Sequence, residues 1–155
     1  MRVKDYMTTA VFYLKANRGL VGAKEIMGWA HVRHVPVVDE KRRVVGVVSH
    51  RDLVRATAVP NQADGGRNAS EVWSVPVEQV MSRDVRTIAP DASIRQAARA
   101  MREGKFGCLP VVDAEGVLVG IITEHDLLWV VEALAPDPDA AVDVDSGLAV
   151  GRRNP

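Results

Sequence analysis

The chain contains one internal repeat, and this repeat restricts its fold more than any other feature of the sequence. Shifted by 74 residues, the segment Val3–Ala56 aligns with Val77–Val130 without a gap. Thirteen aligned pairs are identical: Val3/Val77, Met7/Met81, Val11/Val85, Ala23/Ala97, Met27/Met101, Pro36/Pro110, Val37/Val111, Val38/Val112, Asp39/Asp113, Val45/Val119, Gly46/Gly120, Asp52/Asp126 and Leu53/Leu127. Because solenoid folds need about three or more stacked repeats, two copies predict a pseudo-symmetric pair instead.

Each copy predicts the element order β-α-β-β-α. In the second copy these elements are a strand at Val85–Ile88, a helix from Pro90-Asp91 to Gly104, strands at Leu109–Asp113 and Val117–Thr123 joined by the turn Ala114–Gly116, and a helix at Glu124–Leu134. Apolar residues at helical spacing mark the buried face of the first helix in each copy: Leu20, Ala23, Met27 and Ala30, then Ile94, Ala97, Ala98 and Met101. One copy of about 55 residues buries too little apolar surface alone. We therefore expect an α/β (α+β) fold in which two tandem repeats pack with pseudo-two-fold symmetry.

Composition divides the chain into four parts. Residues 1–58 form the first repeat, 59–76 a linker, 77–135 the second repeat and 136–155 a tail. The centre of the linker, Pro60–Asn68, is rich in turn-forming residues. The tail contains prolines, glycines and aspartates but no aromatic residue and no apolar periodicity, so we expect it to be mostly disordered.

The balance of charge and the single cysteine exclude several classes of function. Twenty basic residues match twenty acidic ones, so no global field favours nucleic acid or an anionic membrane as a partner. Cys108 is the only cysteine, which excludes a disulfide framework and any metal site built from several cysteines. No apolar run is long enough to span a membrane, and residues 1–6 contain no apolar core of a signal peptide. We therefore expect a cytoplasmic protein.

The repeated motifs resemble those of the CBS (cystathionine-β-synthase) domain family. In the first copy Val35–Asp39 is followed by Val45–Leu53, and in the second Leu109–Asp113 is followed by Val119–Leu127. Each motif alone is moderately specific, whereas two motifs at the same internal spacing make a strong match over residues 3–134. The resemblance implies a Bateman module, in which two sheets face each other and leave two clefts. Members of the family often bind adenine nucleotides or S-adenosylmethionine there, and many form dimers.

Each motif places a hydroxyl and a carboxylate where a strand runs into a helix. Ser49 and Asp52 occupy this point in the first copy, and Thr123 and Asp126 occupy it in the second. A helix N-terminus has free N–H groups that attract phosphate, and a carboxylate in the first turn can accept hydrogen bonds from a ribose diol. The same residue pairs also fit a capping box, which only satisfies the start of the helix. The two interpretations are compatible in the empty protein.

The resemblance implies clefts that are built across the two copies. By that pattern, one cleft takes Ser49, Arg51 and Asp52 with Thr87 and the backbone of Gly107, Cys108 and Leu109. The other takes Thr123, His125 and Asp126 with Tyr13 and the backbone of Arg33, His34 and Val35. Arg51 can pair with phosphate as a fork, whereas His125 would do so only weakly near neutral pH. Tyr13 replaces the small hydroxyl residue of the family, and its ring could either fill the space for adenine or stack on the adenine ring. We therefore expect the first cleft to be the occupied one.

Two classes of function remain open after this comparison of motifs. We expect a regulatory sensor of an adenosine-containing ligand (AMP, ADP, ATP or S-adenosylmethionine) that acts on an unknown partner protein and forms a homodimer. The alternative is a ligand-free dimerisation scaffold with vestigial clefts, which Tyr13 favours. In both cases the apolar residues around Trp129 suit a dimer contact.

Signals for catalysis and for metal binding are weak. No activated nucleophile or paired carboxylates point to an enzyme, so we expect a protein without catalytic residues or a cofactor. His31 and His34 could face one way at a helix end and Cys108 adds a soft ligand. The repeat places Lys105 and Cys108 at the positions that match the two histidines, and no carboxylate or cysteine stands beside the histidines in the sequence. We therefore expect no metal.

Overall fold

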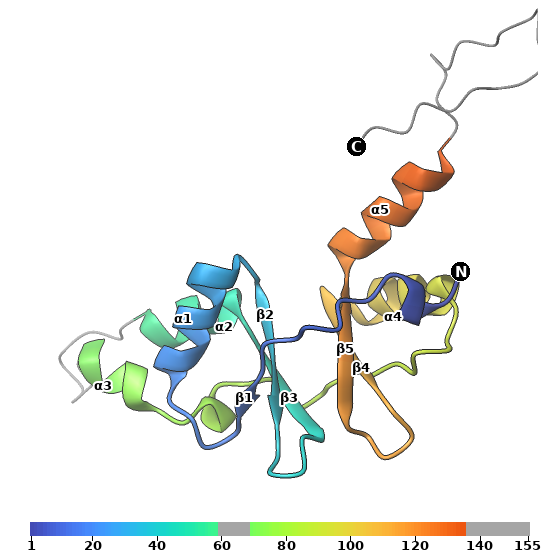
Figure 1. Cartoon of the computed structure of the whole chain (residues 1–155). Helices are drawn as coiled ribbons and strands as arrows, with labels where there is room; N and C mark the ends of the chain where they lie inside the picture. Colours follow the sequence, from blue (N-terminus) through green and yellow to red (C-terminus); the bar gives the residue numbers. More distant parts are fainter. Residues whose placement is uncertain (59–68, 136–155) are drawn as a thin grey trace, which may run out of the picture.

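The computed structural model describes residues 1–58 and 69–135. The first repeat consists of the 3-10 turn η1 (Val3–Asp5), β1 (Leu14–Lys15), α1 (Leu20–Ala30), β2 (His34–Val38), β3 (Val44–Ser49) and α2 (His50–Thr57). The second consists of η3 (Val77–Gln79), α4 (Ile94–Gly104), β4 (Cys108–Val112), β5 (Leu118–Thr123) and α5 (Glu124–Leu134). The two units lie side by side, with α1 and α2 against the first sheet and α4 against the second, while α5 extends away from β5 (Figure 1). The predicted pair of mixed α/β repeats is confirmed.

The two sheets are built from equivalent hairpins with the same register. β2 pairs antiparallel with β3, and β4 pairs antiparallel with β5. His34 stands opposite Ser49 in the first hairpin, and Cys108 stands opposite Thr123 in the second. The first sheet gains a third strand because β1 pairs parallel with β2. The first residue of β2 and the first residue of β4 therefore each lie next to the N-cap residue of the helix that follows the hairpin.

The predicted strand at Val85–Ile88 is wrong in extent. Only Ile88 pairs there, in an isolated parallel bridge with Val111, although its N–H and carbonyl oxygen both bond to β4. The counterpart of this segment in the first repeat forms the two-residue strand β1. The chain reaches Pro90 two residues after Ile88, and a proline has no N–H with which to extend the pairing.

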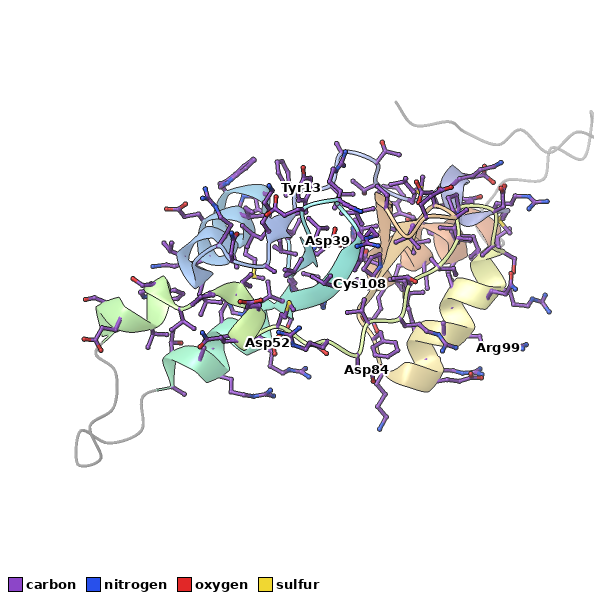
Figure 2. All side chains as sticks on the ribbon, turned by 90° about the horizontal axis from the view of Figure 1, so that it is seen from below. Tyr13, Asp39, Asp52, Asp84, Arg99 and Cys108 are labelled. Atoms are coloured by element: carbon purple, nitrogen blue, oxygen red, sulfur yellow. The ribbon has the colours of Figure 1, made fainter. Side chains whose placement is uncertain are left out.

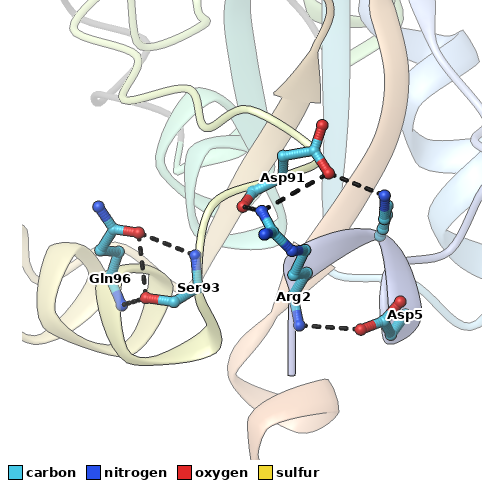
Figure 3. A network of polar contacts seen from close by, with 6 residues as sticks. Arg2, Asp5, Asp91, Ser93 and Gln96 are labelled. Carbon is cyan, nitrogen blue, oxygen red and sulfur yellow. Dashed lines mark hydrogen bonds and ion pairs between the residues drawn. The ribbon is translucent and has the colours of Figure 1, made fainter.

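The helix predicted from Pro90-Asp91 begins later, at Ile94. Ser93 is its N-cap: the Ser93 Oγ accepts a bond from the N–H of Gln96 at 3.2 Å, while the Gln96 Oε1 accepts one from the N–H of Ser93 at 2.8 Å. Asp91 lies outside the helix and pairs with Lys4 at 2.8 Å, beside the Arg2 side chain (Figure 3). The prediction that Ala98 lies on the buried face of this helix is wrong, because Ala98 is exposed. The capping box Ser93-x-x-Gln96 is the sequence signal that marks the true start.

The first residues of each repeat pack on the other repeat. Thr8 forms an antiparallel bridge with Ile121 of β5, and its equivalent Ser82 forms one with Val47 of β3. Val3 is buried in the core of the second repeat, and its equivalent Val77 in the core of the first (Figure 1 shows the N-terminus beside α4). This reciprocal exchange ties the two halves into one folding unit.

Glycines 46 and 120 permit this exchange at the sheet surface. A Cβ at Gly120 would lie 2.6 Å from the Sδ of Met7, and a Cβ at Gly46 would overlap the Sδ of Met81. Both methionines belong to the exchanged segments, so each glycine leaves room for a side chain from the opposite repeat. The identity of these pairs across the 74-residue shift follows from this contact.

A pseudo-two-fold axis passes between the tips of the two hairpins. Arg43 pairs with Val117, its own equivalent in the second repeat, in an isolated antiparallel bridge. The Val44 N–H donates to the Gly116 carbonyl at 3.3 Å, and the Leu118 N–H donates to the Arg42 carbonyl at 3.0 Å. A residue that meets its own equivalent must lie near the axis. The predicted two-fold arrangement therefore has a direct structural expression.

Residues 69–74, within the range expected to be a linker, form the short helix α3 (Ala69–Ser74). This helix contacts α1 and α2, buries Val72, and places the Trp73 ring 4.6 Å from the Lys24 Nζ. The predicted turn-rich centre of the linker, Pro60–Asn68, and the predicted disordered tail, residues 136–155, lie outside the described residues. None of the described helices is long and apolar enough to cross a membrane.

Candidate functional site

A cavity of about 790 Å³ lies where the two repeats meet. Its lining comes from both halves: Arg33, His34, Val47, Ser49, His50, Arg51, Asp52, Val54 and Arg55 from the first, and Ser82, Asp84, Val85, Arg86, Lys105, Phe106, Gly107, Cys108, Pro110 and Glu124 from the second. Figure 2 labels three of these residues, Asp52, Asp84 and Cys108. A concave surface of this size with mixed apolar and polar walls is typical of small-molecule sites.

The N-terminus of α2 forms one wall of the cavity. Ser49 is the N-cap, and its Oγ accepts a bond from the Asp52 N–H at 3.3 Å. The Asp52 Oδ2 in turn accepts bonds from the N–H and the hydroxyl of Ser49, both at 2.7 Å. The capping box anticipated from the sequence is therefore formed. Oδ1 of Asp52 takes part only in a long ion pair with Arg55, at 3.9 Å, and so retains capacity to accept a hydroxyl.

The same cap forms at α5 but away from this cavity. Asp126 Oδ2 accepts bonds from the N–H and the hydroxyl of Thr123, both at 2.7 Å. Neither residue lines the cavity, and neither do His125 and Tyr13. His125 instead lies near Trp129, whose indole N–H donates to its Nε2 at 3.4 Å. These four residues predicted for the second cleft, Thr123, His125, Asp126 and Tyr13, thus lie outside this cavity.

Tyr13 is held by a side chain from near the pseudo-two-fold axis. The guanidinium carbon of Arg42 lies 5.1 Å from the centre of the Tyr13 ring. A stacked guanidinium and phenol attract each other through the ring quadrupole, which favours this position of the ring. The neighbouring Phe12 packs edge-on against Trp29 with ring centres 4.6 Å apart. These two contacts hold Tyr13 and its neighbour Phe12 in place.

The His34 side chain lines the first cavity, whereas the prediction from the family resemblance concerned its backbone in the second cleft and stays a prediction. The antiparallel register places His34 directly opposite Ser49, so its ring shares the sheet edge from which α2 starts. A backbone hydrogen bond continues this pairing by one residue, because the His50 N–H donates to the Arg33 carbonyl at 2.9 Å. Its neighbour Val35 is fully buried and does not line the cavity. Sequence spacing alone does not reveal this register.

Two other predicted residues also fall outside the cavity. Thr87 is exposed, while the adjacent Arg86 lines the wall. Leu109 is fully buried in the core of the second repeat, where it follows the cavity residues Gly107 and Cys108.

The His34 imidazole is half-buried among charged groups. Burial lowers its pKa below the ordinary value, and the positive charges of Arg33 and Arg51 lower it further. The carboxylates of Glu124 and Asp52 act in the opposite direction. Because burial is the largest effect, the imidazole is neutral near pH 7. A neutral imidazole offers one N–H donor and one acceptor to a bound molecule.

Cys108 contributes a thiol to the wall but no reactive thiolate. Burial raises the pKa of the Cys108 thiol to about 12, and the negative charge of Glu124 adds to this effect. A thiolate is the nucleophilic form, so this cysteine acts as a small apolar wall residue. Within residues 1–58 and 69–135, no three His, Cys, Asp or Glu side chains are grouped to hold a metal ion.

Several lining residues were missed by sequence reasoning. They are Arg33 as a side chain, Val47, His50, Val54, Arg55, Ser82, Asp84, Val85, Arg86, Lys105, Phe106, Pro110 and Glu124. Ser82 reaches the cavity through the exchanged segment that pairs with Val47. Lys105 reaches it from the left-handed end of α4, at a φ of 54°. The spacing of residues along the chain gives no signal for the exchange of segments. The basic character of Arg33, Arg55, Arg86 and Lys105 is a signal that could have suggested a site for an anion.

The arrangement combines an apolar slot with hydrogen-bonding groups. The partly exposed side chains of Val47, Val85 and Phe106 offer apolar surface for a flat ring. The free oxygen of Asp52 can accept from a diol, and the arginines can donate to an anion. The wall is therefore chemically suited to a nucleoside with charged substituents.

Comparison with known proteins gives the family. The family model of the CBS domain matches residues 3–59 and 77–133. The chain belongs to the CBS domain family. The model matches each repeat separately, so the chain contains two copies of the family's domain.

Relatives of this CBS pair include both enzymes and isolated pairs. Inosine-5′-monophosphate dehydrogenase of Halalkalibacterium halodurans is 29% identical over 97% of the chain, but the match spans only 27% of that enzyme. The crystal structure of CBSX2 in complex with AMP is 29% identical, with a TM-score of 0.72 over 86% of this chain and 97% of that one. The CBS domain pair of protein MJ0100, in complex with 5′-methylthioadenosine and S-adenosyl-L-methionine, is 25% identical, with a TM-score of 0.71 over 84% and 99%.

Proposed function

We propose that this CBS pair is a regulatory module that binds an adenosine-containing ligand in the cavity between its repeats. The observation that carries the proposal is the composition of that cavity, in which residues of both repeats face the same space. A ligand that contacts both walls favours the arrangement of repeats that fits it best, and this preference is what a partner protein can sense. The complexes of CBSX2 with AMP and of MJ0100 with adenosine derivatives support the choice of ligand class.

The proposed contacts follow the geometry of the wall. The Oδ1 atom of Asp52 accepts from the ribose hydroxyls while Oδ2 keeps the cap. The adenine ring lies in the apolar slot beside Gly107 and Cys108, whose backbone can bond to its edge. Arg51 faces the anionic or polar substituent at the 5′ end. The regulated partner and a cytoplasmic location remain predictions from the sequence.

A matched pair of variants tests this site. Asp52→Ala and Asp126→Ala each remove the same capping carboxylate, so each is expected to cost about 1 kcal/mol of folding free energy. Only Asp52 lines the cavity. In a thermal-shift titration with AMP, ADP, ATP and S-adenosylmethionine, a ligand at a hundred times its dissociation constant adds about 2.7 kcal/mol. We expect this stabilisation in the wild type and in Asp126→Ala, and not in Asp52→Ala. Stabilisation that survives in Asp52→Ala but is lost in Asp126→Ala would place the site in the second cleft.

We also propose that the module forms a homodimer through α5. This helix projects away from β5 (Figure 1), and it exposes four apolar side chains to between 61% and 63%. They are Leu128, Trp129, Val131 and Leu134. Exposed apolar surface that is concentrated on one helix is typical of an interface, and a second copy offers the same surface.

Light scattering coupled to size-exclusion chromatography tests the dimer. We expect a dimer of the wild type and a monomer of the Leu128→Gln, Val131→Gln double variant, with Arg99→Gln on α4 as a surface control. A monomeric wild type would contradict the dimer. A dimer that binds none of the four adenosine ligands would favour the alternative function, a scaffold with vestigial clefts.

A further inference from the structure

The cavity wall carries more positive than negative charge. Five cationic side chains line it: Arg33, Arg51, Arg55, Arg86 and Lys105. Three carboxylates line it as well: Asp52, Asp84 and Glu124. The permanently charged side chains of the wall therefore leave two positive charges in excess, although the chain as a whole has a formal net charge of zero. The excess is local to the cavity and does not follow from composition.

Most of these cations have no carboxylate partner. Of these five cations, only Arg55 forms an ion pair within the described residues, with Asp52 at 3.9 Å. The other four take part in none of the ion pairs that join residues of 1–58 and 69–135. Like charges that share a partly enclosed space repel one another, and an anion placed between them removes that repulsion. The wall therefore has an unsatisfied preference for an anion.

The excess breaks the internal symmetry of the fold. At the positions 74 residues away from the five cations stand Gly107, His125, Trp129, Phe12 and His31. None of these five has a permanent positive charge. The hydroxyl and carboxylate of the helix start are repeated, as Ser49 with Thr123 and Asp52 with Asp126. The duplicated frame is thus present in both repeats, whereas Arg51, Arg55, Arg86 and Lys105 have no cationic equivalent outside the cavity; Gly107, the equivalent of Arg33, lines the same cavity.

We propose that this cavity takes a phosphate-bearing adenosine ligand, one per chain, and discriminates against S-adenosylmethionine. This inference rests on the proposed function and narrows its ligand class. A phosphate carries a charge of about −1.5 to −2 near pH 7 and accepts paired bonds from guanidinium groups. S-adenosylmethionine has a sulfonium and an ammonium group against one carboxylate, so it adds positive charge to a wall that already has an excess.

The distribution of the cations also gives a route from binding to regulation. Arg33, Arg51 and Arg55 belong to the first repeat, and Arg86 and Lys105 to the second. A phosphate group between them bonds to both repeats and removes the repulsion across their junction. An uncharged adenosine derivative fills the apolar slot without this effect. The phosphate is therefore the part of the ligand that draws the two repeats together.

Isothermal titration calorimetry of the full chain with five ligands tests the inference. The ligands are AMP, ADP, ATP, S-adenosylmethionine and the uncharged 5′-methylthioadenosine. We expect the phosphate-bearing ligands to bind once per chain, and S-adenosylmethionine to bind about tenfold more weakly or worse. The affinity of the phosphate-bearing ligands should fall as sodium chloride rises from about 0.05 M to about 0.5 M, because salt screens the charges. The affinity of 5′-methylthioadenosine should change little over the same range.

Two variants remove single cations with little change in the backbone. Arg86→Gln keeps most of the length of an exposed side chain. Lys105→Asn suits the left-handed conformation at position 105, which asparagine tolerates well. Each should weaken AMP binding by about tenfold or more, since bonds to charged groups are strong. Each should change 5′-methylthioadenosine binding less than about twofold. His31→Asn is the matched control, because His31 is the equivalent residue at the same φ of 54° and does not line the cavity.

The outcomes separate this inference from the proposed function. Binding of S-adenosylmethionine as tight as that of AMP, or AMP binding unchanged in both cation variants, would overturn the inference and leave an adenosine sensor. Two AMP molecules per chain, or loss of AMP binding in His31→Asn, would also overturn it, because the site would then not be confined to the cationic side. No binding of any of the five ligands would overturn both.

Discussion

The His34 ring of the first repeat lies directly against Gly107 of the second. A Cβ at position 107 would stand 2.8 Å from the Cε1 of His34 and 2.9 Å from its Nε2, closer than side chains normally approach. Both residues line the cavity, so their contact is a point where its two walls touch. The glycine at 107 is therefore required by the histidine, and not by its own backbone conformation, since its φ is not in the left-handed region.

Gly107→Ala should destabilise the protein through this contact alone. The added methyl must displace the His34 ring, and overpacking of this kind costs about 1 to 3 kcal/mol. In a His34→Ala background the same substitution should cost much less. Urea unfolding of the two single variants and the double variant measures the coupling. A coupling energy below about 0.5 kcal/mol would show that the two residues are independent.

The position of His34 also predicts a pH dependence of stability. Burial lowers the pKa of His34 from 6.5, and in the unfolded chain it returns to that value. Below pH 6.5 the unfolded state binds a proton that the folded state resists. The contribution of this group to the free energy of unfolding is therefore full above pH 6.5 and falls as the pH drops toward the folded pKa.

Two measurements check this prediction. The C–H proton resonance of the His34 ring, followed by NMR, should titrate below the value of an exposed histidine. The difference in unfolding free energy between wild type and His34→Gln should shift against the wild type as the solution is acidified. His31→Gln, at an exposed histidine, is the control. A His34 that titrates at or above its ordinary value would contradict the burial argument.

The exchange of segments predicts that neither half folds alone. A fragment of residues 1–68 lacks Val77 and Met81, which are buried in its core. A fragment of residues 69–155 lacks Val3 and Met7, which pack in the other core. Each fragment should give poorly dispersed NMR amide signals, and mixing the two should restore the spectrum of the whole chain. A folded spectrum from residues 1–68 alone would show that the exchange is not needed for stability.

Gly46→Ala tests the same exchange within the intact chain. The added methyl would overlap the Met81 side chain, so we expect a loss of about 1 to 3 kcal/mol in the free energy of unfolding. Gly28→Ala is the control, because a Cβ at that helical position meets nothing within 4 Å, and alanine favours a helix. A Gly46→Ala variant as stable as the wild type in urea would contradict the close packing of Met81.

Cys108 should react slowly in the folded protein. With a pKa of about 12, only about one thiol in ten thousand is ionised at pH 8, and the residue is 7% exposed. The reaction with an aromatic disulfide reagent should be at least about a hundredfold slower than in urea. Saturating AMP should slow it further, because the thiol lines the proposed binding cavity. A fast reaction in the native state would contradict the burial of the thiol.

The repeat made much of this fold predictable from the sequence. Its 74-residue shift gave the paired architecture, and the motifs Ser49-x-x-Asp52 and Thr123-x-x-Asp126 gave the two capped helices. These features are local, since a cap depends on residues three positions apart. The true start of α4 also has a local signal, the capping box of Ser93 and Gln96, but the prediction instead followed Pro90 and Asp91.

The cavity was less predictable because it depends on contacts between distant segments. His34 reaches it through strand register, and Ser82 through the exchange of the first turns. Neither relationship has a sequence period. The successive residues Asp84, Val85 and Arg86 line the cavity and Thr87 does not, and no helix or strand period marks where this lining ends.

An NMR titration of the full chain with AMP, with assigned amide signals, tests the central claim most directly. The account predicts that the largest shifts fall on both walls of the cavity, at Ser49–Arg55 of the first repeat and at Arg86 and Lys105–Cys108 of the second. Shifts on both walls from one ligand would place it between the repeats. Shifts confined to Thr123–Trp129 and Tyr13, or no shifts at millimolar AMP, would contradict the account.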